Sequence, residues 1–219
     1  MLKPILFMHS YQPDHDKGAP DACRGTFLYT WGRFLEYRFV FDNTRKWENL
    51  LHDEIRVEVD PGQLNTSFKT KEAIRWAYAH GYSHVCYAPT DCYFIIPRLL
   101  RNLDLHTAAG HDYWGFHTYD EQHIGGGSAY WLSRDAMQEV IETDCYPDYE
   151  DRWVGSACRD AGIPAIHDER YRSIEQPYRA DTITTHLSEA TGIYDPEVMK
   201  NLHLRVITGA TYATEEPTL

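Results

Sequence analysis

The chain has 219 residues and a formal net charge of −12, with 33 acidic side chains against 21 Lys and Arg. Hydrophobic residues make up 42% and aromatic residues 14%, which excludes global disorder and supplies one full core without disulfides. The acidic balance disfavours a partner held mainly through a nucleic-acid backbone. An anionic substrate would have to be met by local Arg or Lys side chains, or by a metal ion.

Cysteine use and the N-terminus both indicate a cytosolic protein. The five cysteines are odd in number and none has CxxC spacing, so a disulfide framework and a zinc ribbon are both poor interpretations. The apolar run at 5–8 is too short for a signal peptide or a membrane span. We therefore expect a soluble, cytoplasmic protein without a membrane anchor.

The first half of the chain predicts strands that alternate with helices. Strands are expected where apolar and β-branched residues run together between turn residues, at 4–10, 37–42, 55–59 and 84–88. Helices are expected at 24–34, 44–52 and 66–80. Gly81 can end the last of them in the left-handed conformation. The alternation implies a mostly parallel sheet with right-handed crossovers.

The second half has a less regular pattern. Strands are expected at 112–119, 127–132 and 164–167. Two helices are expected to begin after the capping residues Ser133 and Asp148. Beyond residue 175 the pattern is weak, and the tail from 208 is expected to be loose.

A single acid follows the fourth predicted strand. Pro89 ends that strand, and Thr90, Asp91 and Cys92 come directly after it. Open α/β sheets bind their ligands at the carboxyl ends of their strands, so Asp91 is a candidate ligand for a metal or a ribose. It is also a good N-cap for a helix at 93–103, and the local sequence leaves both interpretations open.

Other chemistry-bearing residues each have a structural alternative. Glu150 and Asp151 open a predicted helix, where they either offset the helix dipole or include a general base. The glycine run at 125–127 is either a loop or a close approach to a ligand, and it lacks the phosphate-binding glycine patterns. His167 and His186 are each either a strand histidine or a ligand. Arg24 either meets a phosphate or pairs with surface acids.

Taken in order, these segments resemble the glycosyltransferases of the β1,3-galactosyltransferase and Fringe type. The resemblance runs from about 4 to 186. It rests on seven short matches in the family's order: 24–31, 38–41, 64–70, Trp76, 90–95, 126–133 and 150–155. No single match is specific, but their order is.

The resemblance implies a GT-A-like α/β domain at 1–207 with a mostly parallel central sheet, divided into a nucleotide-sugar half (1–105) and a smaller, mixed acceptor and catalytic half (106–207). It implies an inverting transfer from a nucleoside-diphosphate sugar, UDP favoured, to an acceptor hydroxyl, with Asp151 as the base. The implied donor-binding residues are Arg24, Asp42, Lys69, Thr90 and Asp91. The implied acceptor-binding residues are Trp114, Gly126, Gly127, Tyr130 and Glu150. Asp91 and His186 would hold a divalent metal, Mn²⁺ or Mg²⁺.

The chain departs from the family at the metal motif, where Thr90, Asp91 and Cys92 replace three acids. A thiol is a soft ligand that suits Mn²⁺ and Mg²⁺ poorly, so a metal would rest on Asp91, His186 and the diphosphate. An alternative function is a non-catalytic sugar- or nucleotide-binding module that has lost its acids. The acceptor is either a glycan or protein hydroxyl or a hydroxymethylated DNA base, and the charge of −12 argues against DNA.

Overall fold

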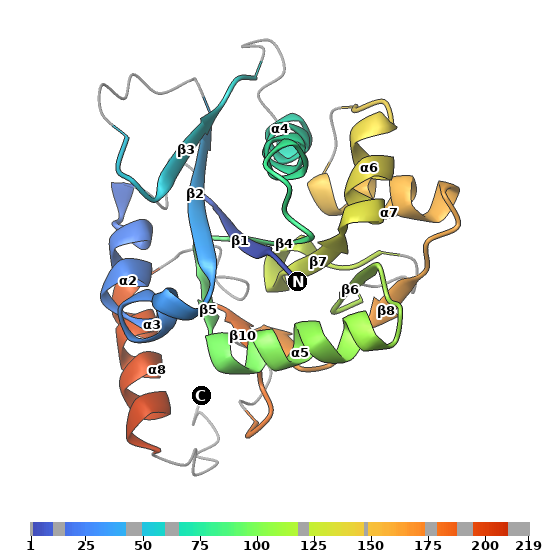
Figure 1. The fold of residues 1–219 in the computed structure, drawn as a ribbon. Helices are drawn as coiled ribbons and strands as arrows, with labels where there is room; N and C mark the ends of the chain where they lie inside the picture. Colours follow the sequence, from blue (N-terminus) through green and yellow to red (C-terminus); the bar gives the residue numbers. More distant parts are fainter. Residues whose placement is uncertain are drawn as a thin grey trace, which may run out of the picture.

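The computed structural model describes residues 2–10, 16–42, 50–59, 66–117, 123–146, 149–173, 179–187 and 195–209. These residues form two sheets with helices on both faces of the larger one (Figure 1). The predicted helix at 44–52 and the proposed cap Asp148 lie largely or wholly outside the described residues.

The larger sheet has seven strands in the order β3-β2-β1-β4-β7-β6-β8. Their bounds are β1 Pro4–His9, β2 Glu36–Asp42, β3 Glu54–Val57, β4 His84–Pro89, β6 Tyr113–Gly115, β7 Tyr130–Ser133 and β8 Ala165–His167. Only β7 runs antiparallel to its neighbours; the other pairs are parallel. The prediction of a mostly parallel sheet is therefore confirmed.

Both faces of this sheet are buried, because successive side chains of a strand point to opposite faces. On β1, Ile5 and Phe7 belong to one core while Leu6 and Met8 belong to the other. The helices α4 (Thr66–Ala79), α6 (Arg134–Glu142) and α7 (Glu150–Asp160) cover the first core. The helices α2 (Ala19–Gly25), α3 (Phe27–Trp31), α5 (Ile96–Ala108) and α8 (Pro196–Thr208) cover the second.

A second, three-stranded sheet has the order β5-β10-β9, with β5 at Cys92–Phe94, β10 at Thr184–His186 and β9 at Tyr171–Ser173. This corrects the predicted helix at 93–103, which begins only at Ile96. The aromatic residues Tyr93 and Phe94 favour a strand, and Pro97 fits the first turn of α5. The N-cap of α5 is Ile95, so the helix-cap interpretation of Asp91 was wrong.

Three further elements differ from the sequence predictions. The helix expected at 24–34 is divided into α2, α3 and a short 3₁₀ helix, η1 (Gly32–Phe34). Helix α8 was missed; it buries Met199, Leu202 and His203. The strand predicted at 127–132 begins only at Tyr130, because 126–128 form a second 3₁₀ helix. The other predicted helices and strands of the described residues are present, and Gly81 adopts the left-handed conformation (φ 74°) as predicted.

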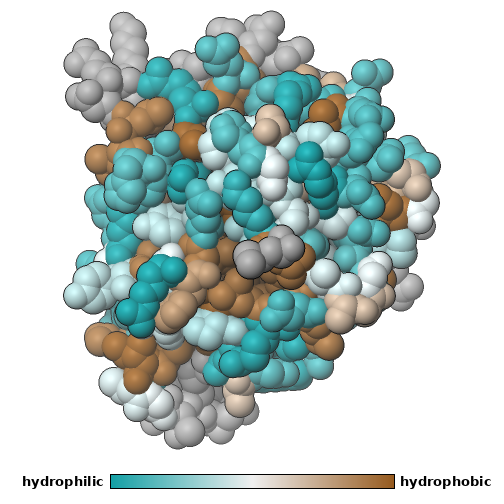
Figure 2. All heavy atoms as spheres, viewed as in Figure 1, coloured by the Kyte–Doolittle hydropathy of each residue, from teal (hydrophilic) through white to brown (hydrophobic). Residues whose placement is uncertain are grey.

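The surface of the molecule carries both hydrophobic and hydrophilic side chains. Figure 2 shows hydrophobic side chains gathered in the middle of the viewed face, with hydrophilic side chains around them. The helices of the described residues all lack the length and apolar character needed to cross a membrane.

Candidate functional site

Three parallel strands bring polar residues to one edge of the large sheet. Strand β1 ends at His9 and is followed by Ser10, β2 ends at Asp42, and β4 is followed by Thr90 and Asp91. The three strands are neighbours, and the backbone N–H of Thr90 donates to the carbonyl of His9 at 3.1 Å. This carboxyl edge is where α/β sheets bind their ligands.

A buried lysine adds a positive charge to this edge. Lys69, on α4, is 4% exposed, and its amine donates to the Ser10 carbonyl at 2.8 Å. The same amine lies 3.6 Å from the Asp42 carboxylate. The structure thus brings together two predicted donor-binding residues, Lys69 and Asp42, at the ends of β1 and β2.

His9 is a site residue that sequence reasoning missed. Its ring bonds the Tyr87 hydroxyl, which also accepts a hydrogen bond from Thr70 Oγ1 at 2.7 Å. Burial and the charge of Lys69 lower the pKa of His9 well below its usual value. The neutral ring therefore accepts from Tyr87 at Nδ1. Its place at the end of the first predicted strand was the one sequence signal that could have found it.

The metal candidates Asp91 and His186 lie together. They are 95 positions apart in sequence, but His186 Nε2 lies 3.1 Å from Asp91 Oδ2. Strand pairing produces this contact, because β10 aligns His186 with Cys92 of β5. The backbone reinforces it, since the Leu187 N–H donates to the Asp91 carbonyl at 3.0 Å.

Two glycines of the 3₁₀ helix η2 (Gly126–Ser128) join the metal candidates to the catalytic candidate. The Gly126 N–H donates to Asp151 Oδ2 at 3.1 Å. A Cβ on Gly126 would lie 2.0 Å from Glu150 Oε1, and one on Gly127 would lie 3.0 Å from His186 Nδ1. The close approach of these side chains is the physical reason for glycine at both positions.

The acid pair is electrostatically coupled. Burial and the charge of Asp151 raise the pKa of Glu150 to about 7. Tyr130 lies in the same environment, and burial and the charge of Glu150 raise the pKa of its hydroxyl. Its ring stacks on Tyr87 with centroids 5.5 Å apart, which links the acid pair to the His9 side of the site.

Asp91 and His186 could hold a divalent ion only together with further ligands from a bound molecule. Two neighbouring ligands on one ion with bonds of about 2.1 Å lie roughly 3 Å apart, close to the Asp91–His186 separation. Cys92 does not join them, since its thiol donates to the Gly127 carbonyl and burial raises its pKa well above the usual value. Among the described residues no group of three or more His, Cys, Asp and Glu is arranged to hold a metal. The pair therefore supplies two ligands at a separation that fits one divalent ion, and the ion would need further ligands from a bound molecule or water.

Two predicted site residues are engaged elsewhere. The Arg24 guanidinium bonds the Asp53 carboxylate at 2.9 and 3.0 Å and Glu54 at 2.7 Å, so its charge is already balanced by acids. Trp114 has no exposed surface, and its Nε1 donates to Asn102 at 3.0 Å in the core beneath α5. The structure does not bring Trp114 to the Gly126–Gly127 cluster.

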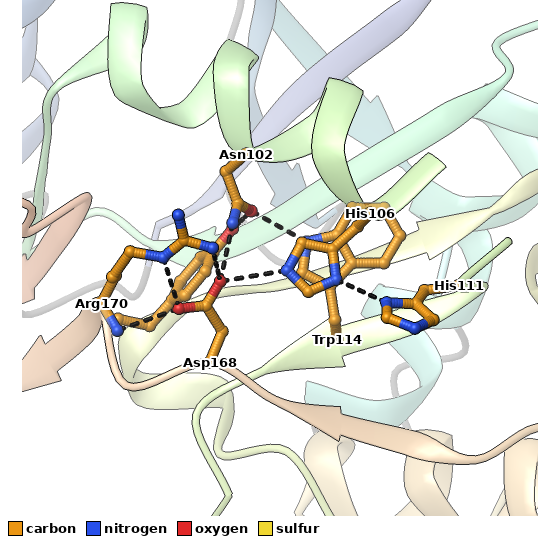
Figure 3. A network of polar contacts seen from close by, with 7 residues as sticks. Asn102, His106, His111, Trp114, Asp168 and Arg170 are labelled. Atoms are coloured by element: carbon orange, nitrogen blue, oxygen red, sulfur yellow. Dashed lines mark hydrogen bonds and ion pairs between the residues drawn. The ribbon is translucent and has the colours of Figure 1, made fainter. Parts of the chain in front are cut away.

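Trp114 belongs instead to a buried polar network that sequence reasoning missed (Figure 3). At its centre the Asp168 carboxylate accepts hydrogen bonds from Asn102 at 2.7 Å, His106 at 3.0 Å and Arg170 at 2.6 Å. Burial alone would raise the pKa of Asp168, but the hydrogen bonds from His106 and Arg170 hold it well below its usual value. The network anchors α5 to the segment between β8 and β9, beside a cavity of about 640 Å³.

Comparison with known proteins identifies the fold. No known family model matches the chain. A glycosyltransferase involved in the glycosylation of the major capsid of PBCV-1 is similar over 91% of this chain and 98% of its own, with a TM-score of 0.54 and 14% identity. Drosophila β-1,4-galactosyltransferase 7, solved with manganese, UDP-Gal and xylobiose, is similar over 85% of this chain and 71% of its own, with a TM-score of 0.50 and 10% identity.

At these identities the likeness concerns the fold alone. It agrees with the architecture described above: one mixed α/β domain with a large, mostly parallel sheet between helices. The more specific resemblance to the Fringe type stays a prediction. The chain has a GT-A-like fold, which it shares with nucleotide-sugar glycosyltransferases.

Proposed function

We propose that the protein transfers a sugar from a nucleoside-diphosphate sugar, UDP favoured, to an acceptor hydroxyl with inversion. One observation carries the proposal: Gly126 and Gly127 join the Asp151 carboxylate to the Asp91–His186 pair at the carboxyl edge of a GT-A-like sheet. The UDP-Gal complex of the Drosophila neighbour supports a UDP-sugar donor.

In this mechanism Asp151 is the general base. Its carboxylate takes the proton of the acceptor hydroxyl as that oxygen bonds the anomeric carbon, and the bond from this carbon to the diphosphate breaks. The Gly126 N–H, 3.1 Å from Oδ2, orients the carboxylate. Burial and the neighbouring Asp151 raise the pKa of Glu150 to about 7, so Glu150 binds a proton more readily than an exposed glutamate does.

On the donor side, Asp42, Lys69, Thr90 and Asp91 surround the nucleotide diphosphate. Lys69 contributes a buried positive charge next to the ends of β1 and β2. Asp91 and His186 would hold a divalent ion, which would neutralise charge on the leaving diphosphate. Arg24 would join the donor site only by exchanging some of its bonds to Asp53 and Glu54.

We predict that Asp151→Asn lowers transfer about 10²–10⁴-fold, because the amide accepts no proton. Donor affinity, measured by calorimetry, stays near that of the unchanged protein. Asp135→Asn is the matched control, because Asp135 is an exposed acid in the first turn of α6. Normal turnover of the Asp151 variant would refute its assignment as the base.

The metal role is tested at Asp91. We predict that Asp91→Ala and chelation each weaken donor binding, and that chelation has little further effect on the variant. Calorimetry of UDP-sugars with and without Mn²⁺ measures both. Donor affinity that responds to neither change would show that the donor site lies elsewhere.

The alternative function, a non-catalytic sugar- or nucleotide-binding module, rests on the reduction of the acidic motif to Asp91. A thermal-shift screen with UDP-, GDP- and dTDP-sugars, followed by a hydrolysis assay, separates the two functions. Hydrolysis of any donor supports the transferase, whereas binding without turnover supports the module.

A further inference from the structure

The cavity of about 640 Å³ beside the Asp168 network contains none of the candidate donor-binding or catalytic residues. Its volume lies within the range of small-molecule sites, about 300–1,000 Å³. Helix α5 contributes the apolar side chains Leu105 and Ala109 to its lining, and β8 contributes Ile166. The cavity therefore offers apolar surface to a small molecule, and its polar atoms decide which kind fits.

A chain of hydrogen bonds runs from the Asp168 network to His111, which lines the cavity. The Asp168 carboxylate accepts from His106 Nε2 at 3.0 Å, so this nitrogen carries the proton of the neutral ring. His106 Nδ1 then has a lone pair, which accepts from His111 Nδ1 at 2.8 Å. His111 Nε2 is left as an acceptor, on the side of the ring that points away from His106 (Figure 3).

The residues behind His111 are held in place. His106 is 6% exposed, and its ring stacks on Trp114 with centroids 4.9 Å apart and planes 5° apart. Hydrogen bonds in series polarise one another, which strengthens His111 Nε2 as an acceptor. An acceptor that is already oriented loses little freedom when a ligand binds.

A second imidazole that lines the cavity has the opposite polarity. His167 Nδ1 accepts the backbone N–H of His117 at 3.1 Å, so the proton of the neutral His167 ring is on Nε2. Metal ligation needs a lone pair, which this Nε2 lacks while it carries the proton. His111 and His167 therefore suit a ligand with a hydrogen to donate and an oxygen that can accept.

The charged groups of the lining are already paired. Arg170 lies 2.6 Å from the Asp168 carboxylate, and Glu169 lies 3.0 Å from Arg179. Burial and the neighbouring His117 lower the pKa of His167, so its ring is neutral at neutral pH. An uncharged ligand leaves these pairs intact, whereas an ion would compete with them.

We propose that this cavity binds a small, uncharged aromatic alcohol whose hydroxyl donates to His111 Nε2 and whose ring lies against Leu105, Ala109 and Ile166. A phenolic hydroxyl, with an ordinary pKa of about 10, is a stronger donor than an aliphatic one. Its oxygen can also accept from His167 Nε2. Binding here requires neither the donor site nor the acid pair, so it does not depend on the proposed function.

The test titrates the full chain at neutral pH with phenol, with toluene, which lacks the hydroxyl, and with benzoate, which is charged. Calorimetry measures affinity, and the amide resonances of 105–111 and 165–170 report the place of binding. We expect phenol to bind about tenfold more tightly than toluene, because one hydrogen bond to an oriented acceptor is gained.

Two variants remove the proposed polar contacts, and both residues lie at the surface. His111→Phe should reduce the affinity for phenol to that for toluene, and His167→Phe should weaken phenol binding by a smaller factor. His80→Phe is the matched control, because His80 is an exposed histidine that stacks on Trp76 and does not line the cavity. It should leave all three affinities unchanged.

Four results would overturn the inference. Equal affinities for phenol and toluene would show that no hydroxyl contact forms. Phenol binding that survives both His111→Phe and His167→Phe would place the ligand elsewhere. Tighter binding of benzoate than of phenol would indicate an anion site at Arg170. Unshifted amide resonances with every probe would show that the cavity binds none of them.

Discussion

At the scale of single residues, the geometry of the site depends on two glycines that have no side chain. Gly126 and Gly127 carry no side chain, so Glu150 and His186 can approach the backbone from two sides. A bare backbone also exposes the Gly126 N–H to Asp151. The sequence left two interpretations of the glycine run, a loop or a close approach of the backbone to a ligand. In the structure the backbone closely approaches side chains of the protein itself.

Replacing each glycine by alanine should impair a different property, the transfer rate for Gly126 and the donor affinity for Gly127. In Gly126→Ala the new Cβ would overlap Glu150 Oε1, so the acid pair must move and transfer should fall about 10²-fold with donor affinity retained. In Gly127→Ala the new Cβ presses on the His186 ring, so donor affinity should fall. Steady-state kinetics and calorimetry separate these effects.

Gly25→Ala is the matched control for both variants, because a Cβ at this position in α2 meets nothing within 4 Å. It should leave kinetics and donor affinity near those of the unchanged protein. Identical defects in Gly126→Ala and Gly127→Ala would contradict the division of the site into a catalytic and a donor side.

At the scale of elements, the Asp168 network holds α5 against the strand segment that leads to β9. Asn102 and His106 come from α5, while Asp168 and Arg170 come from that segment. Since α5 follows β5, and β9 and β5 both pair with β10, this anchor supports the sheet that carries His186. We therefore expect the network to influence the site only through the position of β10.

The network should make folding sensitive to acid. The pKa of Asp168 is lowered in the folded state, so its stabilisation is fully present above the unfolded pKa of about 3.9 and is lost as pH falls below it. Asp168→Asn should lower the free energy of unfolding by about 3 kcal/mol at neutral pH, because Arg170 loses its buried partner.

Urea denaturation at pH 7 and at pH 3.5 measures both effects. Asp160→Asn is the control, because Asp160 forms an exposed pair with Arg159. An Asp168 variant as stable as this control would show that the network contributes little to folding.

At the scale of the whole molecule, the GT-A-like fold collects residues from both halves of the chain at one edge. The first half supplies His9, Asp42, Lys69 and Asp91, and the second half supplies Gly126, Gly127, Glu150, Asp151 and His186. The division into a nucleotide-sugar half and an acceptor half, with a boundary near 105, stays a prediction.

The sequence by itself determined the order of most elements and the positions of the acids. Hydrophobic periodicity and turn residues are local signals, and they were sufficient for β1, β2, β4 and α4. They also located Asp91 after a buried strand. They failed at β5 and α8, where the decisive contacts join residues far apart in the chain.

Only the tertiary structure decided which side chains meet. The pairing of β10 with β5 places His186 beside Asp91. The packing of α5 over β6 buries Trp114, whose indole N–H donates to Asn102 of that helix. Asp91 and His186 are 95 positions apart in sequence, so no local pattern records their contact. Strand register sets which side chains lie opposite one another. Burial then requires each buried polar group to have a hydrogen-bond partner within reach.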